Sequence, residues 1–195
     1  SQIIELGERG SDVNDVAGAF DDLAARVGST GEAMRTSLRD GVQGTVSDFE
    51  LMQVANRALG AGVVRTADDM KTMAEGAKLL GDRTGKSAAE AFEILTNAIA
   101  AGKTTQLRQL DFFVDGAAAA ENYAHKIGKT PGELTQFEKT AAIAQATLAN
   151  LRAETEHAGP ATADFADKIQ QARVAWSNFN DNLGSAIAKS GPLNA

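Results

Sequence analysis

The C-terminal part of the chain repeats apolar side chains, most of them large, at steps of four and three. An α-helix turns once every 3.6 residues, so these positions fall on one face and form a continuous apolar stripe. An apolar stripe of this kind is normally buried against another surface, and the pattern therefore predicts a helix that packs against a partner. We call this set the C-terminal seam, and it consists of Phe165, Ile169, Ala172, Trp176, Phe179, Leu183 and Ile187.

A second seam of the same kind precedes it. Gly159 and Pro160 stand between the two seams, and proline cannot continue a helix while glycine favours its end. Residues 131–195 are therefore predicted to form two long helices, paired either as a hairpin or in an elongated coiled coil. Trp176 is the only tryptophan, and its cover comes either from this chain or from a partner. The second seam consists of Phe137, Ala141, Ala144, Leu148 and Leu151.

Upstream of the seams, glycines divide the chain into short windows with the apolar period of a helix. Hydroxyl and carboxylate side chains stand where these windows begin, and such groups accept hydrogen bonds from the first free backbone amides of a helix. Only residues 110–114 resemble a strand, and we interpret them as a buried loop or single turn. The chain is thus predicted to be all-α. The expected capping residues are Asp12, Thr45 or Ser47, Thr66 with Asp69, Ser87 with Glu90, Asp115, Thr135 with Glu138, and Thr162.

These patterns divide the chain into three predicted segments. Residues 1–45 carry weaker apolar stripes and are expected to order only against a partner or a preceding segment. Residues 46–130 have short loops between their windows and are expected to form a small helical bundle. Residues 131–195 hold the two long helices. The chain begins with Ser1 rather than Met, which is expected of a segment of a longer protein.

No residues form a catalytic, cofactor-binding or metal-binding pattern. His125 and His157 are the only histidines and are too far apart to share a helical turn, and cysteine is absent. Residues 81–87 approximate a phosphate-binding loop, but three residues separate its glycines where that loop has four. We interpret them as one helix ending at Gly81 and another starting at Ser87. The paired acids are interpreted as charges near helix beginnings, namely Asp21 with Asp22 and Asp68 with Asp69.

Composition restricts the partners further. The net charge of −7 and the scattered basic residues argue against specific binding to nucleic acid, which needs clustered Lys and Arg. No stretch approaches the roughly 20 apolar residues that span a bilayer. The chain is 43% hydrophobic but only 5% aromatic, so its cores are expected to be thin and rich in alanine. Thin interfaces suit closely spaced helices better than an enzyme with a deep pocket.

The order of several segments resembles the structured region of tail tape measure proteins of tailed bacteriophages and prophages. The likeness extends over residues 46–192, and Asp111 departs from it because such proteins often have a glycine turn there. The segments that carry it are VSDFELMQVANRAL (46–59), TADDM (66–70), AFEILTNAIAAGK (91–103), LRQLD (107–111), YAHKIG (123–128), LTQFEK (134–139) and FNDNLG (179–184).

The resemblance implies a structural virion protein without enzymatic activity or cofactor. Such a protein occupies the lumen of the tail tube as a helical oligomer, expected to be a trimer, sets the tube length, and leaves the tail during infection. Its expected partners are further copies of itself and the tail tube and tail-tip proteins. Its expected location is the virion tail, after assembly in the bacterial cytoplasm.

Two alternatives remain open from the sequence. The chain could be an enzymatic module of such a protein that cuts the cell wall, because two acids far apart in sequence can still face each other across a cleft. It could also be a cytoplasmic coiled-coil adaptor that forms a defined dimer. A paired-acid cleft or a zinc site would favour the first alternative, and a dimer without tail proteins would favour the second.

Overall fold

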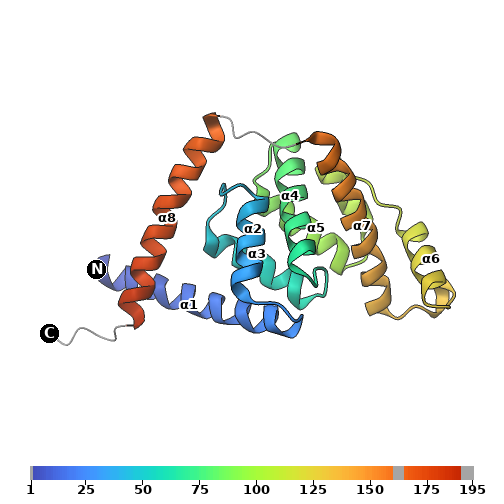
Figure 1. Cartoon of the computed structure of the whole chain (residues 1–195), viewed down its shortest axis with the longest axis horizontal. Helices are drawn as coiled ribbons and strands as arrows, with labels where there is room; N and C mark the ends of the chain where they lie inside the picture. Colours follow the sequence, from blue (N-terminus) through green and yellow to red (C-terminus); the bar gives the residue numbers. More distant parts are fainter. Residues whose placement is uncertain (1, 160–164, 190–195) are drawn as a thin grey trace.

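The computed structural model describes residues 2–159 and 165–189, and in this part of the chain every regular element is a helix (Figure 1). The prediction of an all-α fold is confirmed, and residues 110–114 form a turn and a loop. The α-helices are α1 (Gln2–Arg26), α2 (Gly31–Gly41), α3 (Asp48–Gly60), α4 (Ala67–Thr84), α5 (Ala88–Ala100), α6 (Gly116–Lys126), α7 (Gln136–Ala158) and α8 (Phe165–Lys189), with short 3₁₀ helices η1 (Thr104–Leu110) and η2 (Pro131–Glu133).

Most helices begin at the predicted capping residues. Ser47, Thr66, Ser87 and Asp115 each accept a hydrogen bond from a backbone amide in the first turn of the helix that follows. Thr135 forms a complete capping box with Glu138: its amide donates to the carboxylate at 2.7 Å, and its hydroxyl accepts from the Glu138 amide at 3.2 Å. These side chains satisfy amides that would otherwise lack partners. Thr162 lies outside the described residues.

Three local predictions are wrong. Asp12 does not begin a helix, because α1 starts at Gln2 and runs through it. For the same reason Asp21 and Asp22 lie in the C-terminal half of α1 and not near its start; Asp21 instead binds Arg35 of α2. Helix α4 continues past Gly81 to Thr84, and Gly85 ends it with φ of 71°, a left-handed conformation that glycine adopts without steric cost.

One buried cluster forms the core and draws residues from all three predicted segments. Helices α1 and α2 insert fully buried side chains into this cluster, so residues 1–45 pack against the segments that follow them. The predicted stripes of α4 and α5 are also buried there. The largest fully buried members are Phe20, Met34, Leu38, Leu51, Met70, Met73, Leu80, Phe92, Leu95, Ile99, Leu107 and Leu110.

The two long helices do not pair with each other. Helix α7 packs on α4 and α6, whereas α8 packs on α1, and Figure 1 shows them on opposite sides of the α2–α5 group. The predicted hairpin is therefore wrong, and no coiled coil joins α7 to α8 within the described residues. The α7 seam is buried from Ala141 to Leu151, while Phe137 at its start is exposed.

The loop after η1 turns at Asp111, which adopts a left-handed φ of 50°. The neighbouring Phe112 and Val114 side chains are buried, as predicted for this segment, and Phe113 between them points to solvent. The chain thus makes this turn with an aspartate. Aspartate is one of the few residues that tolerate this conformation.

Acid should weaken the start of α7. The hydrogen bond from Lys129, together with those from the Thr135 amide and hydroxyl, lowers the pKa of Glu138 from 4.5 to about 2. A carboxyl whose pKa is lower in the folded state stabilises the fold above its ordinary pKa, and that contribution disappears as the pH falls toward the folded value. We therefore expect the Glu138 carboxyl resonance to titrate near pH 2 in an NMR experiment. A midpoint near 4.5 would show that the capping box does not form in solution.

Candidate interaction surface

Helix α8 places its polar face on the body of the protein and its apolar face outward. Successive residues of a helix are about 100° apart, so Val174 and Asn178 lie on the side opposite Trp176. Val174 and Asp181 are buried on the inner side, and Val174 is the only large apolar side chain that α8 buries within its described residues. Polar side chains and Gly184 therefore make up most of the docked face of α8 that the structure describes.

Hydrogen bonds to the segment between α2 and α3 hold the first half of α8. The Gln170 side-chain amide donates to the Thr45 carbonyl at 3.2 Å, and that of Gln171 donates to the Gln43 carbonyl at 2.8 Å. These carbonyls belong to a turn in which Gln43 adopts φ of 54°. The turn is irregular, so these carbonyls are not used within a helix and can accept from α8.

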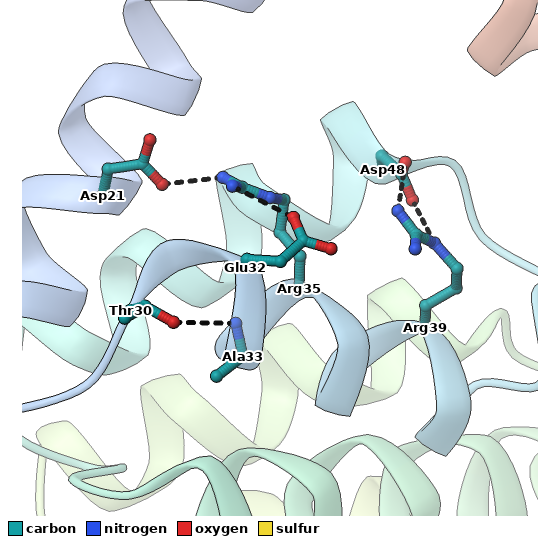
Figure 2. Close-up of polar contacts among 7 residues, drawn as sticks. All are labelled: Asp21, Thr30, Glu32, Ala33, Arg35, Arg39 and Asp48. Carbon is teal, nitrogen blue, oxygen red and sulfur yellow. Dashed lines mark hydrogen bonds and ion pairs between the residues drawn. The ribbon is translucent and has the colours of Figure 1, made fainter.

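Asp48, the first residue of α3, links α3 to both α2 and α8. Its amide donates to the Asn178 side-chain oxygen at 3.0 Å. Its carboxylate accepts from Arg39 at 3.1 and 2.8 Å, as Figure 2 shows, and these bonds raise the pKa of the guanidinium. Arg35, one turn earlier on α2, binds Asp21 of α1 at 2.7 Å (Figure 2). Arg35 and Arg39 of α2 thus hold α1 and α3 in place, and α8 packs on these two helices.

The second half of α8 crosses α1 at two glycines. A Cβ atom built on Gly10 would lie 2.0 Å from the carbonyl oxygen of Gly184, so only glycine permits this backbone approach. One residue further, the Ser185 hydroxyl donates to the Asn14 side-chain oxygen at 2.6 Å. Small residues at a helix crossing allow contact without large side chains. This crossing explains how α8 can dock without turning its apolar stripe inward.

Lys78 of α4, whose side chain is buried, holds the beginning of α8 through an ion pair. Its ammonium lies 3.0 Å from Asp167 and 2.6 Å from Asp82. Burial opposes the charged form, but the hydrogen bonds to both carboxylates outweigh it and raise the pKa of Lys78. Lys78 also borders a cavity of about 620 Å³ that contains Glu75, Asp82 and Glu156 in its lining.

The C-terminal seam forms the outer face of α8. Trp176 is 66% exposed, Phe179 55%, Leu183 43% and Ile169 42%. The rings of Trp176 and Phe179 stack with their centroids 5.7 Å apart, so they present one aromatic surface. Ala172 is exposed and Ile187 half-buried, while the side chain of Phe165 lies outside the described residues. The described part of the chain therefore leaves most of Trp176 uncovered.

Other exposed apolar side chains lie away from α8. Phe113 and Ile127 are exposed before and after α6, and the sequence analysis did not single them out. Phe137 at the start of α7 is exposed too, although Arg65 stacks over its ring at 4.8 Å. These residues come from two separate loops and the first turn of α7, at the α6 and α7 side of the molecule. The α8 face is the longer apolar surface because one helix presents it continuously.

The structure also places the other candidate residues named from the sequence. His125 and His157 are exposed, and the His157 ring lies 2.7 Å from the Ala153 carbonyl. Among residues 2–159 and 165–189, no group of three or more His, Asp or Glu side chains is placed to hold a metal ion. No helix in the same part of the chain is long and apolar enough to cross a membrane. Comparison of the chain with protein families, curated proteins and solved structures finds no match.

Replacing Gly10 by alanine should loosen α8. The added methyl group would overlap the Gly184 backbone, which cannot move without shifting α8, and overpacking of this kind typically costs about 1–3 kcal/mol. We expect faster hydrogen exchange in α8 while α4 and α5 remain protected. Gly18→Ala is the matched control because nothing lies within 4 Å of its added Cβ, and alanine should stabilise α1 by about 0.5–1 kcal/mol. Equal protection of α8 in both variants would contradict the close crossing.

Proposed function

We propose that this chain is a segment of a structural virion protein of the tail tape measure type, and that it associates with copies of itself through the outer face of α8. The observation that carries this proposal is the seam of Ile169, Trp176, Phe179 and Leu183 lying exposed on one helix. Contiguous apolar surface with exposed aromatic side chains is typical of protein interaction sites. The proposed role is therefore structural, and it requires assembly but no chemistry.

The resemblance supplies the biological setting of the proposal. The segments that carry it are now helical elements: residues 46–59 coincide closely with α3, residues 91–103 include most of α5, and residues 179–184 belong to α8. In the resembling family, copies of the protein fill the tail tube, set its length and leave the tail during infection. Self-association, with the trimer that the resemblance implies, and contact with tail tube and tail-tip proteins belong to this proposal.

Within this role, we assign the segment to a folded module and not to the measuring rod. A rod converts chain length into distance at about 1.5 Å per residue only when its helices run end to end. Here α2, α3, α4 and α5 instead pack side by side around one buried cluster. A module of this shape adds little length, and it can position copies of the parent protein relative to one another.

The exposed α8 face also favours a second candidate function, a cytoplasmic coiled-coil adaptor. Such an adaptor would use the same face, so its geometry alone does not separate the two candidates. The two candidate functions differ in where the protein is found. The adaptor remains in the soluble fraction of the cell, whereas the tape measure type is packaged in tailed particles.

Mass spectrometry of purified particles tests the proposed function. Tailed particles from the organism that encodes the chain are purified on a density gradient, and the tails are separated from the heads. We expect peptides of residues 1–195 in the tail fraction, in a fixed ratio to the tail tube protein. An abundant cytoplasmic enzyme serves as the control for contamination. Peptides confined to the soluble fraction would contradict the virion role and support the adaptor.

A further inference from the structure

We propose that α8 is a detachable helix, which releases from the body of the protein as one unit while the rest of the fold stays intact. The body consists of residues 2–159, from α1 to α7. Release leaves the outer face of α8 unchanged and exposes its inner face. Under the proposed function, on which this one consequence rests, copies joined through their outer faces stay joined while their bodies separate. Three features of the docked helix support the proposal.

The first feature is that the core is complete without α8. The buried cluster takes side chains from α1 to α5, from η1 and from α7, and none from the described part of α8. The helices beneath α8 are also linked independently of it. Arg35 of α2 binds Asp21 of α1. Arg39 of α2 binds Asp48 of α3. Release of α8 therefore removes no side chain from the core and breaks neither of these links, and such a unit can open at a lower free energy than the whole domain.

The second feature is that water can replace the hydrogen bonds at the first half of α8. Gln170 and Gln171 donate to carbonyls of the turn between α2 and α3, and Asn178 accepts from the first amide of α3. Gln170 is exposed, and Gln171 and Asn178 are half-buried, so water reaches these contacts. A hydrogen bond of this kind adds little net stability, because water offers equivalent bonds to the separated groups.

The ion pair at the beginning of α8 also allows release. Lys78 pairs with Asp167 of α8 at 3.0 Å, and with Asp82, one turn further along its own helix, at 2.6 Å. Removing the partner of a buried charge is strongly destabilising when no other partner is present. Here α4 supplies that second partner. Lys78 therefore remains paired within α4 when α8 leaves.

The third feature is the crossing of α8 with α1, where backbone meets backbone. A Cβ atom built on Gly10 would lie 2.0 Å from the carbonyl oxygen of Gly184, and neither residue has a side chain to interlock with the other helix. The adjacent contact joins two polar side chains, Ser185 and Asn14, at 2.6 Å. Helices usually pack by inserting side-chain ridges into grooves. At this crossing, α8 can separate from α1 without withdrawing a large side chain from a pocket.

Hydrogen exchange in low concentrations of urea tests the release. The chain is diluted until it sediments as a monomer, and the exchange of its backbone amides is followed by NMR at several urea concentrations. We expect the amides of α8 to share one opening, with protection factors at least about a hundredfold lower than those of α4 and α5. Their dependence on urea should also be weaker, because release exposes less surface than global unfolding.

Two outcomes of this experiment would overturn the proposal. Amides of α8 that exchange only together with those of α4 and α5 would show a single cooperative unit. Protection that decreases gradually along α8 towards Lys189 would show fraying of a helix that stays docked. Because the samples are monomeric, neither outcome bears on the proposed self-association, and the particle analysis decides the virion role separately.

A reversible cross-link between α1 and α8 provides a second measurement. The chain has no cysteine, so Asn14→Cys with Ser185→Cys introduces a single pair where the two side chains lie 2.6 Å apart. We expect oxidation to raise the protection of all of α8, including Gln170 and Gln171, at least about tenfold, and reduction to reverse it. The reduced form is the matched control because it carries the same substitutions. An increase confined to the residues around Ser185 would show that the two halves of α8 open separately, and release as one unit would be wrong.

Discussion

Replacing Trp176 and Phe179 together by alanine is expected to abolish self-association while the fold survives. Aromatic residues at the centre of an interface typically contribute at least about 2 kcal/mol each, and every 1.4 kcal/mol changes a dissociation constant tenfold. The double variant should therefore associate roughly a thousandfold more weakly. Both side chains are more than half exposed in the single chain, so their loss should change the unfolding free energy of the monomer by no more than about 0.5 kcal/mol.

Sedimentation equilibrium and thermal unfolding of the same samples measure these two effects separately. The matched control is Phe113→Ala, which removes an equally exposed phenylalanine from the loop before α6 and should leave association unchanged. A double variant that loses helicity throughout the chain would show that the seam packs within one molecule. In that case the outward orientation of α8 would be wrong.

Replacing Phe92 by alanine should have the largest effect on the fold itself. Phe92 is fully buried in the common cluster on α5, and truncation of a buried phenylalanine typically costs 3–5 kcal/mol. The free energy of unfolding of native domains is only about 5–15 kcal/mol, so this variant should retain a much smaller free energy of unfolding. The loss combines the transfer of the ring to water with the cavity that remains.

Urea unfolding monitored by circular dichroism measures that loss. Phe113→Ala is again the control, because it makes the same chemical change at an exposed position and should alter the midpoint little. The cluster contains side chains from α1 to α5, from η1 and from α7, so Phe92→Ala should lower the stability of all of these helices together. Unfolding of α5 while α2 and α4 remain folded would indicate separate cores and would contradict the single cluster.

The helices were predictable because local chemistry determines where they begin. Ser47, Thr66, Ser87 and Thr135 accept hydrogen bonds from the first amides of their helices regardless of tertiary context. The prediction was wrong where a residue typical of a helix start or end has another structural role. Asp12 resembles a cap but lies within α1, and Gly81 resembles a helix end but packs close to the backbone of Lys86 and Ser87.

Whether each seam is buried or exposed could not be predicted from the residue spacing, because burial depends on the surface that lies opposite the helix. The α7 seam is buried because α4 offers a glycine there: a Cβ built on Gly76 would lie 2.6 Å from the side chain of Leu151. The α8 seam is exposed because Gln170 and Gln171 donate to carbonyls of an irregular turn, and Asn178 accepts from the first amide of α3. Neither the turn nor the direction of its carbonyls leaves a sequence signal.

The fluorescence of the unmodified chain as a function of concentration tests the central claim most directly. Trp176 is the only tryptophan and lies at the centre of the seam, so its emission reports only on this face. We expect emission at the wavelength of a hydrated indole and strong quenching by iodide in dilute solution, with a shift to shorter wavelength and loss of quenching as copies associate. Emission that stays hydrated at every concentration, or stays buried even when the chain is monomeric, would contradict the claim.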